Sequence, residues 1–241
     1  MSLQYTVESL KLSILNGSDP KGDAAQQAID DMLAFLQKQR DMLPRYVEFA
    51  GLTGETFTIP ELIAQWIDRA TCHNPFNDTT ERLKYVSVCD HAERRWLAAT
   101  DGFRIHAHTT DLELGVYLMV DNKLRAVNSK HINWCGVVPV EPTPVTVGEC
   151  KEIKYPASIF DDDVEIAFGW FFNGKKLTKT GKGTPYRLHP RFWNEALSFG
   201  VDPTFSIGEL RQGDTENYMR RMVITWPDAF AVIMPMRPEP K

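Results

Sequence analysis

The sequence has few cysteines and no long apolar run. Four cysteines in 241 residues are too few for a disulfide scaffold, so we interpret them as small buried hydrophobic residues. No window approaches the roughly 18 consecutive apolar residues that a membrane span requires. Residues 1–15 (MSLQYTVESLKLSIL) alternate polar and apolar side chains and include Glu8, unlike a signal peptide. We therefore expect a cytoplasmic protein with no membrane partner.

An excess of basic residues is absent too. The chain has 27 basic and 32 acidic residues and a net charge of −5. This balance excludes a protein that coats nucleic acid with its whole surface, but it leaves a local basic face open. Hydrophobic residues make up 43% and charged residues 24% of the chain, which is typical of a globular protein with a sizeable core.

The common catalytic and ligand-binding motifs are missing as well. The sequence contains no GxSxG, no HExxH, no EF-hand loop and no GxGxxG after a predicted strand. Residues 180–184 (TGKGT) lack the spacing of a phosphate-binding loop. The pairs Cys72-His73 and Cys89-x-His91 lack the usual spacing of zinc ligands. We therefore expect no cofactor, no metal and no enzymatic activity; an enzyme with an unrecognised site is one alternative.

Hydrophobic periodicity predicts one order of elements twice: a strand, a helix and three strands. In both cases a proline, Pro60 or Pro190, opens the helix. This pattern predicts the α+β class, with antiparallel sheets and helices on one face. The predicted elements are strand 56–59, helix 61–70 and strands 83–88, 95–99 and 104–108, then strand 186–188, helix 191–199 and strands 205–210, 218–226 and 230–236.

Four further segments complete the prediction. Alternating apolar residues predict a strand at 5–15, and a stripe at three- and four-residue spacing predicts a helix at 23–43. Asn173-Gly174 indicates a tight hairpin turn. The proline-rich stretch 137–147 is the best candidate for a linker between domains.

Two short stretches carry a resemblance to a known family. Residues 98–105 read AATDGFRI, similar to the Ala-Thr-Asp-Gly-His-Arg-Leu segment of bacterial DNA sliding clamps, the β subunit of the replicative DNA polymerase. Residues 231–237 read AVIMPMR and resemble that family's carboxy-terminal Val-Val-Met-Pro-Met-Arg-Leu. With the segments around them, from about 55 to 110 and 184 to 237, the resemblance covers about half the chain. It implies a DNA-clamp-like fold of strand-helix-three-strand units.

The resemblance also implies two clamp-like domains in a shortened or divergent member. The first would span residues 1–137, with a divergent N-terminal half at 1–54 that has no clear counterpart. The second would span residues 138–241 and carry the C-terminal groove strand.

In that family the two stretches meet and line a groove for short linear motifs of polymerases and repair proteins. Methionines adapt to varied apolar ligands, Pro235 stiffens a wall, and Gly102 lets a peptide approach the backbone. The alternative is that Met234 and Met236 are ordinary strand residues. Phe103 replaces the family's usual His and makes the groove more apolar. We expect both stretches to lie side by side in one apolar concavity. The resemblance assigns the client-peptide groove to Thr100, Gly102, Phe103, Arg104, Ile105, Val232, Met234, Pro235 and Met236.

Clamps in this family surround duplex DNA and hold it by sequence-independent attraction to phosphates. Three copies of a two-domain chain would complete a homo-oligomeric ring of six domains. The predicted helices carry few basic residues, so the densest basic segment is the better candidate for DNA contact, with a solvated turn as the alternative. These candidates are Lys175, Lys176, Lys179, Lys182 and Arg187.

We therefore expect a sliding-clamp-like processivity factor that binds short motifs of polymerase and repair clients and encircles or abuts duplex DNA. One alternative is a clamp-fold adaptor or inhibitor that keeps the groove without encircling DNA. The oligomeric state and the identity of the clients are open at this point.

Overall fold

A computed structural model describes residues 30–36, 48–73, 78–154, 166–210 and 220–236. The chain divides into two compact units, Met1–Leu52 and Thr53–Lys241. In the first unit, residues 30–36 are helical and lie within the helix predicted at 23–43. The rest of that helix and the predicted strand at 5–15 lie outside the described residues. The predicted domain boundary between residues 137 and 138 remains a prediction.

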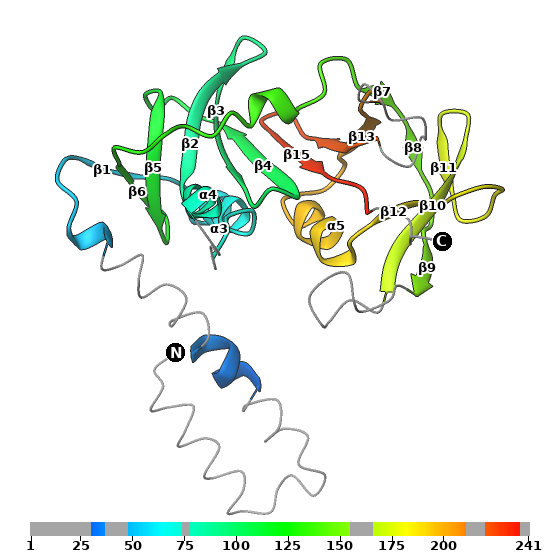
Figure 1. The fold of residues 1–241 in the computed structure, drawn as a ribbon, viewed down its shortest axis with the longest axis horizontal. Coiled ribbons are helices and arrows are strands. Elements are labelled where there is room, and N and C mark those ends of the chain that lie inside the picture. The colour runs from blue at the N-terminus through cyan, green and yellow to red at the C-terminus, as the bar shows by residue number, and fades with distance from the viewer. Residues whose placement is uncertain (1–29, 37–47, 74–77, 155–165, 211–219, 237–241) are drawn as a thin grey trace, which may run out of the picture. The chain divides into compact units, whose positions relative to one another are not determined.

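The second unit is built on a ten-stranded sheet in which every neighbouring pair is antiparallel (Figure 1). Within the sheet, the pair β4 with β15 joins the strands of the first predicted strand-helix-three-strand unit to the last three strands of the second. In spatial order its strands are β1 (Thr56–Thr58), β6 (Lys123–Ala126), β5 (Gly115–Val120), β2 (Val86–His91), β3 (Arg94–Thr100), β4 (Arg104–Thr109), β15 (Ala229–Ile233), β14 (Met222–Thr225), β13 (Thr204–Ile207) and β7 (Thr143–Pro144).

A smaller five-stranded sheet holds the remaining strands. Its one parallel pair, β11 with β8, departs from the predicted antiparallel arrangement. The predicted hairpin turn is present but shifted by one residue, because Asn173 still pairs with Lys176 and the turn is Gly174-Lys175. The strands are β12 (Tyr186–Leu188), β10 (Ile166–Asn173), β11 (Lys176–Thr178), β8 (Thr146–Val147) and β9 (Lys151–Lys154), the last pairing with β10.

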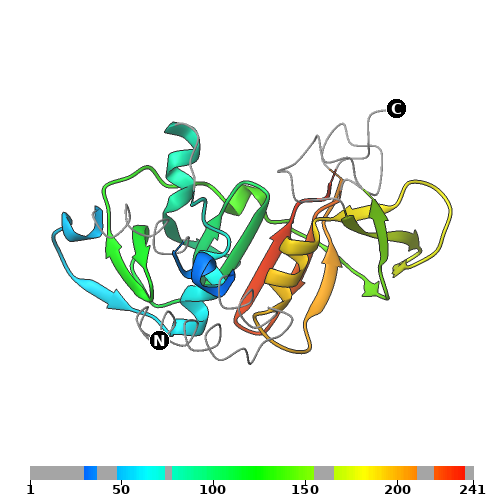
Figure 2. The same cartoon turned by 90° about the horizontal axis from the view of Figure 1, so that it is seen from below.

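Two helices cover one face of the ten-stranded sheet (Figures 1 and 2). They are α3 (Glu61–Asp68) and α5 (Pro190–Leu197). Trp66 of α3 donates its indole N–H to the carbonyl of Ala196 in α5, 3.1 Å away, so the two helices also contact each other. The shorter helical pieces are α4 (Asp78–Glu81), η1 (Arg82–Lys84) and η2 (Cys135–Val137).

The order strand, helix, three strands occurs twice, so the predicted α+β fold class is confirmed. Several predicted ends differ from the observed ones by a few residues, and two of the differences change the type of element. Residues 82–84 form the helical turn η1, so the strand predicted at 83–88 begins only at Val86; the buried Lys84 at the end of this turn binds Glu81 at 3.1 Å. The stretch 137–147 is more than a linker, because it supplies β7 to one sheet and β8 to the other.

The side chains of β15 show how the sheet separates two cores. Ala229, Ala231 and Ile233 pack into the larger core on the helix side. Phe230 and Val232 point to the opposite face, as the alternation of a strand requires. That second face is covered by the segment around η2, which contributes the buried Trp134. No helix in the described ranges is long and apolar enough to cross a membrane.

Candidate functional site

The first motif forms the turn between β3 and β4. The Thr100 hydroxyl donates to the Arg104 carbonyl at 2.7 Å and accepts the Gly102 N–H at 3.1 Å. Asp101 accepts the backbone N–H groups of Phe103 and Arg104 at 2.9 and 3.0 Å. Gly102 has φ +92°, which favours glycine over any residue with a Cβ. Thr-Asp-Gly is therefore a self-capped turn that fixes the start of β4.

The second motif lies directly beside this turn. Val232 pairs with Ile105 and Ile233 with Arg104 in the β4–β15 register. Just beyond β15, the Met234 N–H donates to the Phe103 carbonyl at 2.8 Å. The expected side-by-side placement of the two stretches is therefore present, and main-chain hydrogen bonds hold it.

A cavity of about 140 Å³ opens where the two motifs meet, and its lining is mainly apolar. Thr100, Gly102, Arg104 and Ile105 contribute to it from β3, the turn and β4. Six predicted groove residues thus surround one hollow. The complete lining is Leu83, Thr100, Gly102, Arg104, Ile105, Ile132, Asn133, Trp134, Val137, Val232 and Met234.

One side of the cavity was not predicted from the sequence. This groove wall consists of Ile132, Asn133, Trp134 and Val137, around the turn η2. The Asn133 side chain accepts the Gly136 N–H at 3.3 Å, and the Val137 N–H donates to the Trp134 carbonyl at 2.9 Å. Loop residues carry no periodic signal, and only the isolated Ile132 and Trp134 in a polar stretch indicated burial.

The other three predicted groove residues lie outside the cavity lining. Phe103 is 54% exposed, and its ring stacks on Phe192 of α5 with centroids 6.3 Å apart. Phe192 in turn stacks on His189 at 4.5 Å. Phe103, Phe192 and His189 thus form an aromatic shelf next to Met234. Pro235 is half-buried, and the buried Met236 donates its N–H to the Arg187 carbonyl at 2.9 Å.

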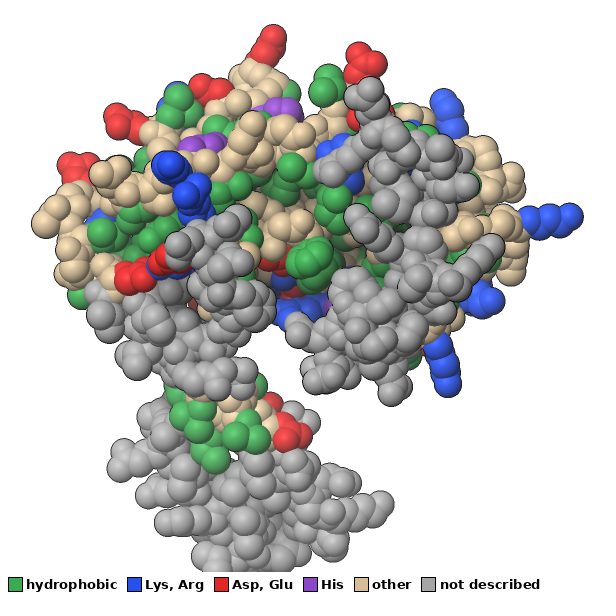
Figure 3. Space-filling view, in the orientation of Figure 1, with side chains coloured by type: hydrophobic (Ala, Val, Ile, Leu, Met, Phe, Trp, Pro, Cys, Tyr) green, Lys and Arg blue, Asp and Glu red, His purple; other side chains and the backbone are tan. Residues whose placement is uncertain are grey.

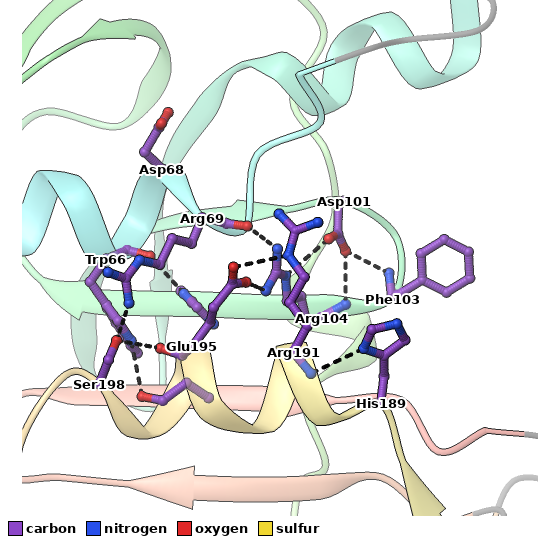
Figure 4. A network of polar contacts seen from close by, with 12 residues as sticks. Trp66, Asp68, Arg69, Asp101, Phe103, Arg104, His189, Arg191, Glu195 and Ser198 are labelled. Atoms are coloured by element: carbon purple, nitrogen blue, oxygen red, sulfur yellow. Dashed lines mark hydrogen bonds and ion pairs between the residues drawn. The ribbon is translucent and has the colours of Figure 1, made fainter. Parts of the chain in front are cut away.

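Arg104 has a structural role besides lining the cavity (Figure 4). Its buried guanidinium pairs with Asp101 at 3.0 Å, with Glu195 of α5, and with the main-chain carbonyl of Arg69. The same group lies 4.5 Å from the centre of the Phe192 ring. Burial alone would raise the pKa of the Glu195 carboxyl, but the charge and hydrogen bonds of Arg104, with a further bond from Arg191, lower it overall. The network fixes the groove motif to both helices.

The lysines predicted to contact DNA lie on the β10–β11 hairpin and just beyond it. Lys175, Lys176 and Lys182 are exposed, and Figure 3 shows Lys and Arg side chains projecting over the five-stranded sheet. Lys179 is also exposed and binds Glu149 at 3.2 Å. Arg187 differs from the lysines, because its Nε and Nη1 atoms are buried in β12.

A larger open hollow lies at the β2–β3 hairpin, away from the groove residues. Two of its charged side chains form ion pairs within the protein: Arg95 binds Asp90 at 3.2 Å, and Arg94 lies 3.6 Å from Asp228. Among the described residues, no group of three or more His, Cys, Asp and Glu side chains is arranged to hold a metal ion.

The chain is similar in fold to solved structures of bacterial sliding clamps. The DNA polymerase sliding clamp of Bacillus subtilis aligns with TM-score 0.43 and 12% identity, over 77% of this chain and 65% of that one. The DNA polymerase III β subunit of Thermotoga maritima aligns with TM-score 0.45 and 14% identity, over 78% and 67%. The sliding clamp of Bartonella birtlesii bound to griselimycin aligns with TM-score 0.48 and 10% identity, over 78% and 68%.

Likeness at such identities concerns the fold and says nothing of partners. The chain spans 65% of the length of the Bacillus subtilis clamp that it matches. No protein-family model and no curated protein matches the sequence.

Proposed function

We propose that this protein binds short linear peptide motifs of DNA replication and repair proteins in the groove where the β3–β4 turn and the end of β15 meet the segment around η2. The observation that carries this proposal is the apolar cavity at the junction of the two motifs. The sequence resemblance to sliding clamps suggests replication and repair proteins as the partners. The cavity offers a place for an apolar side chain of such a partner.

The site suits an extended peptide for physical reasons. A short peptide loses conformational freedom on binding, so a few buried apolar anchors must provide most of its binding free energy. Ile105, Val232 and the polarizable Met234 offer such contacts. The aromatic shelf of Phe103, Phe192 and His189 extends the apolar surface beyond the cavity. We expect affinities of about micromolar strength.

The test is titration of a labelled peptide that ends in an apolar pair such as Leu-Phe. We expect Met234→Ala to weaken binding by roughly 1–3 kcal/mol through lost apolar contact. Val201→Ala is the control, because Val201 is 84% exposed and lies outside the cavity lining. Equal binding by wild type and Met234→Ala, or no binding by the wild type, would contradict the proposal.

Contact with duplex DNA is a second candidate function, supported by the exposed lysines of the β10–β11 hairpin. We expect binding to fall steeply with salt, since each lysine–phosphate contact releases counterions. Lys176→Glu should weaken binding to a labelled duplex and reduce its salt dependence. Lys123→Glu, an exposed lysine of β6 in the other sheet, is the matched control. An equal effect of both changes would remove the hairpin as a DNA site.

The mass in solution separates an encircling clamp from an adaptor. Three copies of this 27.5 kDa chain would complete a ring of six domains if each copy supplies two. Such a ring requires one head-to-tail contact repeated between copies. A trimeric mass by light scattering supports the processivity factor. A monomer that still binds the client peptide supports the clamp-fold adaptor.

A further inference from the structure

Two cysteines lie against each other beside the groove. The sulfur atoms of Cys89 in β2 and Cys135 in η2 are 2.8 Å apart, although the residues are 46 positions apart in the sequence. Both are free thiols and both are half-buried. The two other cysteines are placed differently: Cys72 donates its N–H to the Leu83 carbonyl at 2.9 Å, and Cys150 packs against the helix-side core.

The pair connects the groove wall to the sheet. Cys135 lies inside the groove wall, directly after Trp134 and two residues before Val137, and both of these line the cavity. Cys89 pairs with Trp96 in the β2–β3 ladder, so its position is fixed by the sheet. Both cysteines pack against the core beneath the wall. A covalent bond between them would fasten the wall to β2.

We propose that Cys89 and Cys135 are an oxidisable pair, and that their disulfide fixes the groove wall and tightens the binding of client peptides. The effect on peptides rests on the proposed function of the groove, whereas the disulfide and its effect on the wall do not.

The chemistry balances with a small-molecule disulfide such as oxidised glutathione as the oxidant. A thiolate of one cysteine attacks the glutathione disulfide, forming a mixed disulfide and releasing one glutathione thiol. The thiolate of the second cysteine then attacks the protein sulfur, which forms the Cys89–Cys135 bond and releases the second glutathione. The protein loses two electrons and two protons, and the two glutathione molecules gain them.

The Cys89–Cys135 bond requires only a small movement of the two sulfur atoms. A disulfide has a sulfur–sulfur distance of about 2.05 Å, so the sulfurs must approach by about 0.8 Å. Burial, and then the hydrogen bond to Cys135, raise the pKa of the Cys89 thiol. Cys89 is therefore protonated at neutral pH, and the exchange should be slow and should speed up as the pH rises.

Fixing the wall should favour binding because it removes freedom that a client would otherwise have to restrict. In the reduced protein, packing and the hydrogen bonds of the η2 turn hold the wall. The disulfide would hold it in nearly the arrangement that forms the cavity. A site fixed in its bound form binds more tightly, since less ordering remains to be done on association.

The first experiment follows the bond itself. The full chain is equilibrated with reduced and oxidised glutathione and mapped by mass spectrometry after alkylation of free thiols. We expect a Cys89–Cys135 crosslink in wild type and in the matched control Cys150→Ala, and none in Cys89→Ala or Cys135→Ala. Cys89 and Cys135 that remain thiols, or that stop at the mixed disulfide, would overturn the proposal.

The second experiment compares oxidised and reduced wild type. Hydrogen exchange at residues 132–138 should slow on oxidation, and the labelled Leu-Phe peptide should bind about 3–10-fold more tightly, with both effects reversed by dithiothreitol. A crosslink that changes neither exchange nor affinity would overturn the inference. If oxidation slows hydrogen exchange in the wall but the peptide binds in neither state, the proposed function fails, whereas the effect of the disulfide on the wall is supported.

Discussion

Two arginines of very different exposure bind the same carboxylate, Glu195. Arg104 is 3% exposed and reaches it from β4, whereas Arg191 is 66% exposed and reaches it from one turn earlier in α5. A buried charge cannot fall back on water when its partner is removed, so the two ion pairs should differ greatly in their effect on stability.

Replacing Arg104 by Gln should lower the free energy of unfolding by about 3 kcal/mol, because Asp101 and Glu195 lose a buried cation. Arg191→Gln should cost less than about 1 kcal/mol, since that pair is exposed. Urea unfolding followed by tryptophan fluorescence measures both. Equal losses would show that the network does not depend on the buried arginine.

His106 makes stability depend on pH. The side chain is 0% exposed, its Nδ1–H donates to the Trp66 carbonyl at 2.7 Å, and its ring stacks on Trp66 at 4.4 Å. Burial lowers its pKa from 6.5 to about 3. Between these values the unfolded chain binds a proton that the folded chain does not, so stability falls as the pH falls through this window.

We therefore expect the His106 contribution alone to lower the free energy of unfolding by about 2 kcal/mol between pH 7 and pH 5. Urea unfolding at both pH values tests this, with His106→Gln losing that part of the pH dependence. His108→Gln is the control, because His108 is only partly buried on the same strand. An unchanged pH dependence in His106→Gln would disprove the assignment.

Among the elements, the β2–β3 hairpin has an unusual turn. Ala92 and Glu93 have φ of 50° and 62°, a left-handed conformation in which asparagine and glycine are usual. The polar turn at residues 90–93 was predictable from composition. Its backbone strain was not, because the turn residues are ordinary and the strands around them decide the geometry.

Glu93→Gly should raise the free energy of unfolding by about 0.5 kcal/mol, since relief of the left-handed strain exceeds the added freedom of the unfolded chain. The reverse change at Gly174, which has φ 60° and no neighbouring atom within 4 Å of an added Cβ, supplies the control. Gly174→Ala should cost about 1 kcal/mol. Thermal and urea unfolding measure both, and a loss in Glu93→Gly would contradict the strain argument.

The types of the main helices and strands were more predictable from the sequence than the way in which short segments join them. Amphipathic spacing, with Pro60 directly before α3 and Pro190 as the first residue of α5, was sufficient to predict both helices. Strands of two residues such as β7 and β8 have no periodicity, so nothing local could show that they join sheets. Two motifs far apart in the chain were sufficient to predict the side of the cavity formed by the β3–β4 turn, β4 and the end of β15. The groove wall depends on a loop that crosses the sheet, a tertiary contact that no local pattern encodes.

At the scale of the whole unit from Thr53 onward, one continuous sheet carries all of the first strand-helix-three-strand unit's strands and the last three strands of the second, whose first strand, β12, lies in the smaller sheet. Ala231 of β15 pairs with His106 on one side and with Ile224 on the other. The helices above this joint also bind each other through Trp66 and the Arg104 network. Neither strand-helix-three-strand unit can lose its structure without exposing the edge of the other.

This unit should therefore unfold in a single transition. Far-UV circular dichroism and tryptophan fluorescence should give coincident urea curves, as a two-state transition requires. Ile224→Ala, a change in the fully buried core of β14, should shift both curves together by about 2–4 kcal/mol. Two separated transitions would show that the β4–β15 joint does not couple the units.

The β4–β15 joint also sets the moment at which the groove comes into existence during synthesis. The ribosome makes Ile105 and the groove wall well before Val232 and Met234. Until β15 is made and pairs with β4, the edge of β4 is open. The apolar residues of the groove wall then lack the β15 side chains against which they pack in the complete fold. A nascent chain that lacks β15 therefore exposes this apolar surface and has no complete cavity. Clients would thus engage only chains whose translation has passed β15 and whose two strand-helix-three-strand units have joined.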